Sequence, residues 1–311
     1  MFLTSNGSDA RVRPWQSYLF HSTSCPKIFQ ALREGYLENL FTFEVYNFRK
    51  ELFPDYGNYP SIMISIVIPT YNEDANIRRC LSALSNQTIP RELYELIVVD
   101  GGSKDLTREI AAEYADLVFI QASERVPGAR NDGFLRARHD IVATTDADSV
   151  VAPDWVEQIL QTFEDPGVVL AFGPVKPIEN TPRNRRYVVI FRMLMRFGVA
   201  TRLYYYTLGC NTVFRYDALE KAGMYRIMDA GDDLEVAIRI RRKGKVVFNP
   251  NLTVGFDFRR YEQFGFWLTV FEWYLIVLRG GISKRLSYTR REYSKTKPSG
   301  QIITSNPPGK N

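Results

Sequence analysis

Short apolar runs alternate with amphipathic segments between residues 62 and 262 of this 311-residue chain. The first run, residues 62–68 (IMISIVI), has no polar alternation, which is typical of a strand covered on both faces. A helical stripe of Ile77, Leu81 and Leu84 follows it. The same patterns predict strands at 96–99, 117–120, 141–145, 168–172 and 207–215, and helices at 105–114, 127–138, 153–163, 184–199 and 231–244. This alternation predicts an α/β fold with a mostly parallel sheet flanked by helices.

The chain divides into four parts by composition. We expect a partly helical N-terminal extension at residues 1–60, a main domain at 61–262, an apolar helix at 263–282 and a basic, disordered tail at 283–311. The apolar run 264–278 (FGFWLTVFEWYLIVL) would form a helix about 22 Å long, shorter than the ~30 Å hydrocarbon core of a bilayer. Because basic residues flank it, the run suits a membrane interface, but a core or oligomer contact explains it equally well.

The positive charge of the chain is concentrated at its C-terminus. The net charge is +5, but residues 279–311 alone carry eight Lys or Arg against one acid, so the rest of the chain is slightly negative. A basic tail without a basic body gives no support for nucleic-acid binding. Hydrophobic residues make up 45% of the chain, which is enough for an ordinary globular core.

Cysteine and histidine usage limits the possible chemistry. Cys25, Cys80 and Cys210 show no Cys-x-x-Cys spacing, so we expect reduced thiols and no structural zinc. His21 and His139 are the only histidines, which disfavours histidine-based nucleophilic catalysis. We find no secretory leader and no apolar run of the ~18 residues that a membrane span needs. We therefore expect a cytoplasmic protein, for which peripheral contact with the cytoplasmic face of a membrane stays open.

Two carboxylates, Asp146 and Asp148, follow the predicted strand at 141–145. Open α/β sheets bind ligands where their strands end. Side chains two residues apart in an extended segment point the same way, so this pair could converge on one hard cation such as Mg²⁺ or Mn²⁺. Aspartates also stabilise turns, so the pair alone does not decide between a metal site and a turn.

Five motifs follow one another along the main domain. They are residues 66–73 (IVIPTYNE), 98–107 (VVDGGSKDLT), 127–133 (PGARNDG), 146–148 (DAD) and 231–233 (GDD). In this order and at these intervals they resemble glycosyltransferase family 2 on a GT-A fold, which is a Rossmann-like α/β fold, and the resemblance covers about residues 62–262. It implies a hexosyltransferase-type enzyme that moves a sugar from a UDP- or GDP-sugar to an acceptor hydroxyl or phosphate.

The resemblance assigns the donor to the first four motifs. It implies nucleotide-sugar binding by Pro69, Thr70, Tyr71, Glu73, Asp100, Ser103, Arg130, Asp146 and Ala147. Asp148, together with Asp146, would ligate the Mg²⁺ or Mn²⁺ that neutralises the diphosphate leaving group. The Arg130 guanidinium suits phosphate oxygens. Asp100 would accept a hydrogen bond from the nucleotide base, although a turn-forming role also explains it.

The last motif would supply the general base, Asp233. The family usually has Glu-Asp here and this chain has Asp232-Asp233, which puts the role of Asp232 in doubt. Two acids at a helix start also stabilise the helix by roughly 0.3–1 kcal/mol each, and spacing alone favours that explanation. A single base without a second carboxylate placed as a nucleophile implies inversion at the anomeric carbon. The acceptor-side residues would be Asn211, Asp232, Arg259 and Arg260.

Other enzyme classes fit the sequence less well. Processive synthases of the family carry Gln-x-x-Arg-Trp after the base and several membrane spans, whereas this chain has residues 258–265 (FRRYEQFG), so we expect one sugar per encounter. A sugar-phosphate nucleotidyltransferase or a dehydrogenase would have a Gly-rich loop after the first strand, where this chain has PTYNE. A catalytically silent sugar-nucleotide-binding or scaffold protein is the alternative from another class. The acceptor is left open between a polyprenyl phosphate, a lipid-linked glycan and a free saccharide.

Overall fold

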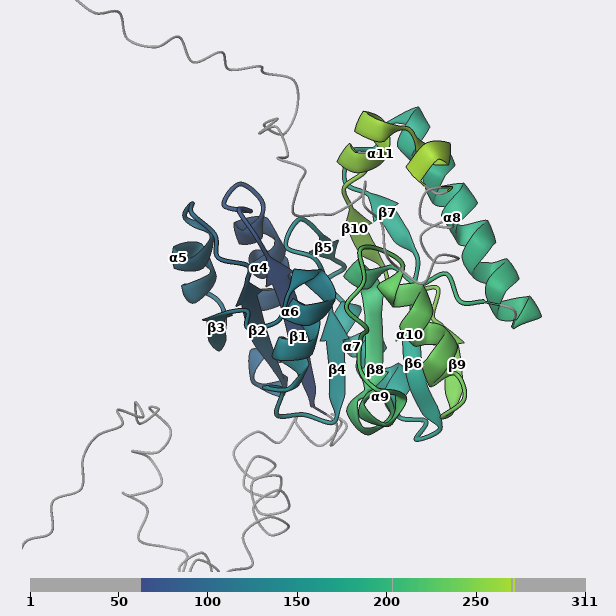
Figure 1. Cartoon of the computed structure of the whole chain (residues 1–311), viewed down its shortest axis with the longest axis horizontal. Helices are drawn as coiled ribbons and strands as arrows, with labels where there is room; N and C mark the ends of the chain where they lie inside the picture. The colour runs from purple at the N-terminus through teal and green to yellow at the C-terminus, as the bar shows by residue number, and fades with distance from the viewer. Residues whose placement is uncertain (1–62, 203, 270, 272–311) are drawn as a thin grey trace, which may run out of the picture. The chain divides into compact units, whose positions relative to one another are not determined.

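The structure is a computed structural model that describes residues 63–202, 204–269 and 271 (Figure 1). Within these residues a main sheet has seven strands in the order β3-β2-β1-β4-β8-β6-β9. The strands are β1 Ile64–Thr70, β2 Tyr94–Asp100, β3 Leu117–Ile120, β4 Ile141–Thr144, β6 Val168–Phe172, β8 Thr212–Arg215 and β9 Lys245–Phe248. β8 runs antiparallel to its neighbours β4 and β6, and the other pairs are parallel. The predicted mostly parallel α/β sheet is confirmed.

Helices cover both faces of this sheet. They are α4 Ile77–Ser85, α5 Thr107–Ala112, α6 Arg125–Phe134, α7 Trp155–Phe163, α8 Pro182–Thr201, α9 Tyr216–Ala222, α10 Asp232–Ile240 and α11 Arg259–Phe264. One buried cluster joins Val67, Val99 and Phe172 of the sheet to α6, α8 and α10. Figure 1 shows α6 and α10 in front of the sheet. Every residue of β1 and β2 is buried, as expected for strands covered on both faces.

Helix α6 lies unusually close to the sheet. A Cβ at Gly133 would lie 2.3 Å from Cγ1 of Val67, so the helix can approach β1 this closely only because residue 133 is glycine. The loop before the helix is fixed by Asp132, whose Oδ2 accepts from the backbone N–H groups of Ala122 and Ser123 at 2.6 and 2.8 Å. These contacts hold α6, and Arg130 on it, against the carboxyl edge of the sheet.

A second sheet has three short strands, β5 Val150–Val151, β10 Val254–Phe256 and β7 Val175–Pro177, in the order β5-β10-β7. The sequence did not predict these strands, because two or three residues are too few for a period-two pattern. The predicted strand at 207–215 is also shorter in the structure. Residues Gly209–Asn211 form a 3₁₀ turn, η3, in which the backbone N–H of Asn211 donates to Leu208 O at 2.8 Å.

Several predictions fall outside the described residues. They include the extension at 1–60, the tail at 283–311 and all of the apolar run beyond residue 271. Cys80 and Cys210 are buried free thiols, as predicted. In the part of the chain that the structure describes, no helix is long and apolar enough to cross a membrane.

Candidate active site

Most of the sequence-predicted site residues come from the carboxyl ends of three neighbouring strands and from the start of α10. The others lie on α6 (Arg130), in η3 (Asn211) and on α11 (Arg259 and Arg260). Thr70 and Asp100 are register partners at the ends of β1 and β2, and the turn that carries Asp146 follows β4. Asp232 is the first residue of α10. Crossovers in a parallel sheet bring such ends together at one edge, where α/β proteins bind ligands.

The loop after β1 has both buried and exposed groups. Pro69 is buried in β1, and the Oγ1 atom of Thr70 is buried without a hydrogen-bond partner among the described residues. Tyr71 is 57% exposed. Glu73 accepts a hydrogen bond from Nδ2 of Asn76 at 2.6 Å, and burial together with the nearby Asp148 raises the pKa of Glu73 to about 7. The unsatisfied hydroxyl and the exposed ring suit contacts with a ligand.

Asp100 has no exposed surface and organises its own loop. Its Oδ2 accepts from the backbone N–H groups of Gly102 and Ser103 at 2.9 and 2.8 Å, and its Oδ1 accepts from the Ser103 hydroxyl. Gly102 has a φ of +87°, which glycine adopts without strain. The turn-forming role of Asp100 accounts for these hydrogen bonds, and its Oδ2 also lies 3.7 Å from Nε of Arg108. Nucleotide binding by Asp100 and Ser103 stays a prediction.

Asp146 and Asp148 lie in a turn and not in an extended segment. The turn is closed by the backbone N–H of Ser149, which donates to Asp146 O at 3.0 Å, and Ala147 within it is buried. The expectation that the two carboxylates point the same way as strand residues is therefore wrong. Asp146 pairs with Arg130 at 3.2 Å, and Asp148 pairs with Arg259 at 2.9 Å.

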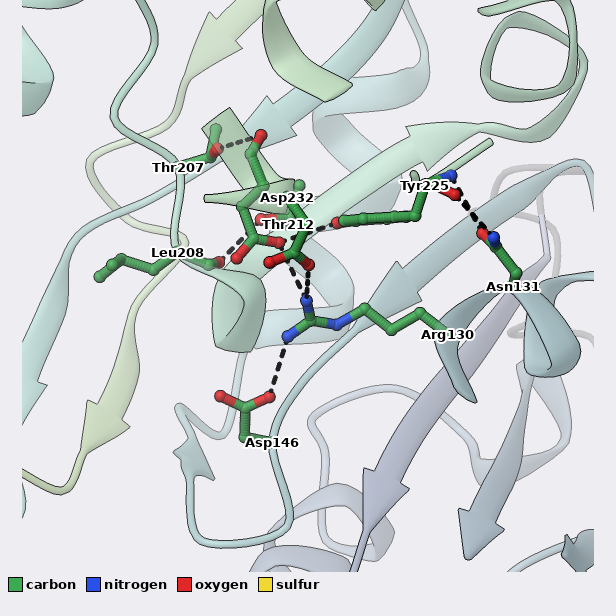
Figure 2. A network of polar contacts seen from close by, with 9 residues as sticks. Arg130, Asn131, Asp146, Thr207, Leu208, Thr212, Tyr225 and Asp232 are labelled. Atoms are coloured by element: carbon green, nitrogen blue, oxygen red, sulfur yellow. Dashed lines mark hydrogen bonds and ion pairs between the residues drawn. The ribbon is translucent and has the colours of Figure 1, made fainter. Parts of the chain in front are cut away.

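Arg130 joins the aspartates of two distant motifs (Figure 2). Its Nη1 donates to Oδ2 of Asp232 at 2.7 Å and to Oδ1 of Asp233 at 3.2 Å, while its Nη2 donates to Oδ1 of Asp146 at 3.2 Å. The Arg130 side chain is only 5% exposed, so these charges interact with little screening by water. The DAD and GDD motifs therefore lie on opposite sides of one buried guanidinium.

Gly209 makes room for that guanidinium. A Cβ at residue 209 would lie 1.9 Å from Nη2 of Arg130, so a side chain there would require the guanidinium to move. Gly209 lies inside the predicted strand at 207–215, and the structure explains the glycine by a close approach of the backbone to a buried cation.

Tyr225 was not predicted from the sequence. Its hydroxyl donates to Oδ1 of Asp233 at 3.0 Å, and the guanidinium of Arg130 lies 5.4 Å from the centre of its ring. Asn131 holds the Tyr225 backbone through two hydrogen bonds of 2.8 and 3.0 Å (Figure 2). A lone tyrosine in a loop carries no sequence signal for this role.

Burial controls the ionisation of the acidic residues around Arg130. It raises the pKa of Asp233 to about 7 and that of Asp146 to about 6, and the Arg130 guanidinium opposes both shifts. Burial also raises the pKa of Asp232. A carboxylate whose pKa lies near neutrality can accept a proton from a substrate hydroxyl at working pH.

A second arginine, Arg259, lies among three other acids. Its Nη2 lies 2.9 Å from Asp148 Oδ2 and 3.9 Å from Glu73 Oε1, and its Nε lies 2.7 Å from Asp257 Oδ2. Asp257 was not predicted as a site residue. Arg260 is in α11 as well, but its side chain lies outside the described residues.

The predicted metal site would need phosphate oxygens of a bound substrate in addition to its own carboxylates. The structurally described part of the chain contains no group of three or more His, Cys, Asp or Glu side chains that could hold a metal ion. Asp146 and Asp148 offer two carboxylates, and Mg²⁺ beside substrate phosphates often uses one or two carboxylates plus phosphate oxygens. The acids around Arg130 and Arg259 outnumber the two arginines, so the site also has negative charge for a cation to balance. The residues therefore fit a divalent ion that arrives with a diphosphate.

Asn211 is not available to an acceptor in this structure. It has no exposed surface, accepts from Nε1 of Trp155 at 2.9 Å and donates to Leu252 O at 2.8 Å. The prediction that Asn211 lies on the acceptor side is corrected, because its amide is used in joining α7 to the segment before β10.

Comparison with known proteins identifies the family of this chain. Residues 65–223 match the family model described as glycosyl transferase family 2. The glycosyltransferase AglE of Haloferax volcanii is 33% identical over 180 residues, which is 54% of this chain and 58% of AglE. A dolichyl N-acetyl-alpha-D-glucosaminyl phosphate 3-beta-D-2,3-diacetamido-2,3-dideoxy-beta-D-glucuronosyltransferase of Methanococcus voltae is 26% identical, over 61% of this chain and 65% of that protein. The chain thus spans less than two thirds of the length of either relative.

Two solved structures share the fold. Mannosyltransferase PcManGT from Pyrobaculum calidifontis, in complex with GDP-Man and Mn²⁺, aligns with a TM-score of 0.50 at 21% identity over 70% of this chain and 65% of its own. S. aureus TarS in complex with UDP aligns with a TM-score of 0.51 at 15% identity over 63% of this chain and 60% of its own. The fold is GT-A, and the chain belongs to glycosyltransferase family 2.

Proposed function

We propose that this protein is a hexosyltransferase that moves one sugar from a nucleotide-diphosphate sugar to an acceptor, with inversion at the anomeric carbon. The observation that carries the proposal is the Arg130 cluster, in which one buried guanidinium contacts Asp146, Asp232 and Asp233. A purely structural ion pair would need one carboxylate for one guanidinium. Three acids around one cation are better explained by a site in which a metal ion adds positive charge or in which one of the carboxylates takes up and releases a proton.

Asp233 acts as the general base in this proposal. Its Oδ1 accepts from the Tyr225 hydroxyl and from Arg130, so its carboxylate is held in one orientation. Its pKa of about 7, raised by burial, allows it to take the proton of an attacking hydroxyl near neutral pH. The attack of that hydroxyl on the anomeric carbon breaks the bond to the diphosphate in the same step, which inverts the configuration. Asp232 accepts from the same Nη1 atom of Arg130 as Asp233 does, so it weakens the interaction between the guanidinium and the base, Asp233.

Asp146 and Asp148 would hold Mg²⁺ or Mn²⁺ together with the donor diphosphate. Such an ion supplies charge neutralisation to the leaving nucleoside diphosphate. Arg259 forms an ion pair with Asp148 at 2.9 Å. Donor binding therefore requires Arg259 to share that carboxylate with the metal ion or to move to the phosphate oxygens. Of the two structural neighbours described above, PcManGT was solved with GDP-Man and Mn²⁺, which supports the same pairing here.

The donor nucleotide, a UDP- or GDP-sugar, would lie along the loop that follows β1. Support comes from the buried, unsatisfied Thr70 hydroxyl and the exposed Tyr71 ring, which suit a ribose and a base. Pro69, Glu73, Asp100, Ser103 and Ala147 complete the proposed set as residues that shape the loops.

The acceptor would approach from the side of α11, where Arg259 and Arg260 lie. Arginine pairs well with phosphate, so a lipid-linked glycan, which has a phosphate for the arginines and a sugar hydroxyl for Asp233, fits this side better than a neutral saccharide. The Methanococcus voltae relative is named for a dolichyl N-acetyl-alpha-D-glucosaminyl phosphate, a lipid-linked sugar, which supports this choice. We propose non-processive transfer, at the cytoplasmic face of a membrane, where the free thiols of Cys80 and Cys210 would stay reduced.

Donor hydrolysis tests the proposal. The purified protein is incubated with UDP- and GDP-sugars and Mn²⁺ without acceptor, and release of the nucleoside diphosphate is measured. We expect release from at least one donor, which is lost in Asp233→Asn. No release from any common donor would favour a silent sugar-nucleotide-binding protein, and release of pyrophosphate from a nucleoside triphosphate with a sugar phosphate would favour a nucleotidyltransferase.

A further inference from the structure

Helix α8 has an apolar stripe on its exposed face. Val189, Met193 and Phe197 are 51%, 65% and 55% exposed. A spacing of four residues places them one above another on the helix surface. The opposite face of α8, with Val188, Phe191 and Met195, is buried in the core, so the exposed stripe is not needed for folding.

Arginines surround this stripe. Arg183, Arg185, Arg186, Arg192, Arg196 and Arg202 are exposed, and the segment from residue 182 to residue 202 contains no acid. Arg185, Arg192 and Arg196 are spaced by seven and four residues, so they form a row along the helix next to the apolar one. None of these side chains forms an ion pair with another residue that the structure describes.

A second exposed apolar group lies beside α8. Phe266 is buried against the helix, with its ring 4.4 Å from that of Tyr187 and nearly parallel to it. The residues that follow turn outward, since Trp267 is 71% and Phe271 57% exposed. Figure 1 shows α8 along the outer side of the molecule with α11 next to one end of it. We call the exposed residues of α8, with Trp267, Leu268 and Phe271, the α8 surface.

We infer that the α8 surface docks on the face of a lipid bilayer that contains anionic lipids. Apolar side chains at an interface enter the boundary between headgroups and acyl chains, and arginines pair with lipid phosphates. Helix α8 has 20 residues and is therefore roughly 30 Å long, enough to contact several lipids when it lies flat. This inference goes beyond the proposed transfer reaction, and it concerns binding alone.

The charge of the α8 surface argues against other occupants. A second copy that docked through the same face would bring arginines against arginines, which is unfavourable. The C-terminal tail at 279–311 is strongly basic as well, so it would be repelled in the same way. A monomeric soluble protein rarely exposes a continuous apolar patch without a partner. An anionic bilayer offers both the opposite charge and an apolar layer.

Docking through α8 would orient the proposed active site. Tyr261 of α11 packs on Phe191 of α8, with ring centres 5.6 Å apart, and Arg259 lies on the same short helix. Trp267 and Leu268 of the α8 surface follow the end of α11 by three and four residues, so a bilayer held against this surface would lie next to the element that carries Arg259. A substrate anchored in that bilayer would reach the site without leaving the membrane.

Vesicle flotation with the full-length protein tests the inference. Vesicles of phosphatidylcholine alone are compared with vesicles of equal parts phosphatidylcholine and phosphatidylglycerol. The variants are Arg185→Gln/Arg192→Gln/Arg196→Gln and Met193→Ser/Phe197→Ser. The charge control, Lys221→Gln/Arg242→Gln/Lys243→Gln, removes three exposed cations elsewhere, and the apolar control, Ile120→Ser/Leu135→Ser, changes two side chains that are 56% and 64% exposed.

We expect the wild-type protein and both controls to float with the anionic vesicles. Each arginine near an anionic surface contributes a factor of about five in binding, so the triple α8 variant should bind on the order of a hundredfold more weakly. The double α8 variant should also bind more weakly, and thermal melting should show that all variants are folded. Equal flotation of both α8 variants and the wild-type protein would overturn the inference and assign binding to another segment. A dimer of the wild-type protein that dissociates in the α8 variants would overturn it in favour of a second copy.

Discussion

A Cβ atom on residue 209 would lie 1.9 Å from Nη2 of Arg130, so the guanidinium at the centre of the site can keep its position only while residue 209 is glycine. Gly209 belongs to η3 and Arg130 to α6, two elements far apart in the sequence. The fit between them positions the acids that we assign to catalysis.

Gly209→Ala should displace the Arg130 guanidinium from its three aspartates. Buried acids that lose their cation are costly, so we expect a loss of about 3 kcal/mol or more in the free energy of unfolding. Donor hydrolysis should be lost as well. Urea unfolding and an assay of nucleoside diphosphate release measure the two effects.

Gly167→Ala is the matched control, because a Cβ there would meet only Oδ1 of Asp165 at 3.1 Å. Its stability should stay within about 0.5 kcal/mol of the wild-type value. If Gly209→Ala were as stable and as active as this control, neither stability nor activity would depend on the position of the Arg130 guanidinium that we describe.

Asp233→Asn should keep donor binding and lose turnover by about a hundredfold to ten-thousandfold, the usual contribution of a general base. The amide keeps an acceptor oxygen for Tyr225 but cannot take a proton. Calorimetric titration with UDP or GDP and a transfer assay separate binding from chemistry. Asp217→Asn is the control, since Asp217 and Asp233 are each the second residue of a helix and share any effect on the helix dipole. Wild-type turnover in Asp233→Asn would remove the residue from the mechanism.

The rate of transfer should depend on pH through Asp233. Arg130, Asp232, Tyr225 and Asp146 surround this carboxyl, and burial raises its pKa to about 7. A general base acts in its ionised form, so kcat/KM should be full above pH 7 and should fall as the pH drops through that value. The profile of kcat/KM against pH measures the titration in the free enzyme. A rate that is constant through the neutral range would contradict the assignment.

Asp148→Ala should abolish the metal-dependent part of donor binding. The substitution removes one of two proposed ligands and frees Arg259, which is 2.9 Å away. Calorimetric titration of GDP or UDP, with and without Mn²⁺, should then give the same weak affinity in both conditions. Asp257→Asn is the control, because Asp257 contacts the same arginine at 2.7 Å without being a proposed ligand. An unchanged Mn²⁺ effect in Asp148→Ala would place the ion elsewhere.

The sheet was predictable because each long strand is buried on both faces. Residues 62–68 form an uninterrupted apolar run, and the structure has β1 at Ile64–Thr70 with every residue buried. The motif order also located the site at the ends of the strands. By contrast, β5, β7 and β10 have two or three residues each and leave no periodic signal.

The contacts within the site could not be predicted from the sequence. Asp146 and Asp148 were expected to point the same way, but a turn sends them to two different arginines. Asn211 was expected on the acceptor side, and it instead bonds Trp155 in the interior. Tyr225 and Asp257 were missed altogether. Each of these outcomes depends on long-range packing, which the local sequence pattern does not determine.

Arg130 and Asp232 are separated by 102 residues along the chain and meet in one ion pair. During synthesis Arg130 and its partner Asp146 therefore emerge from the ribosome long before Asp232 and Asp233. Until α10 has been made, Arg130 has only one of its three aspartates, and the chain has no general base. A chain that stops short of residue 232 should consequently be inert toward nucleotide sugars.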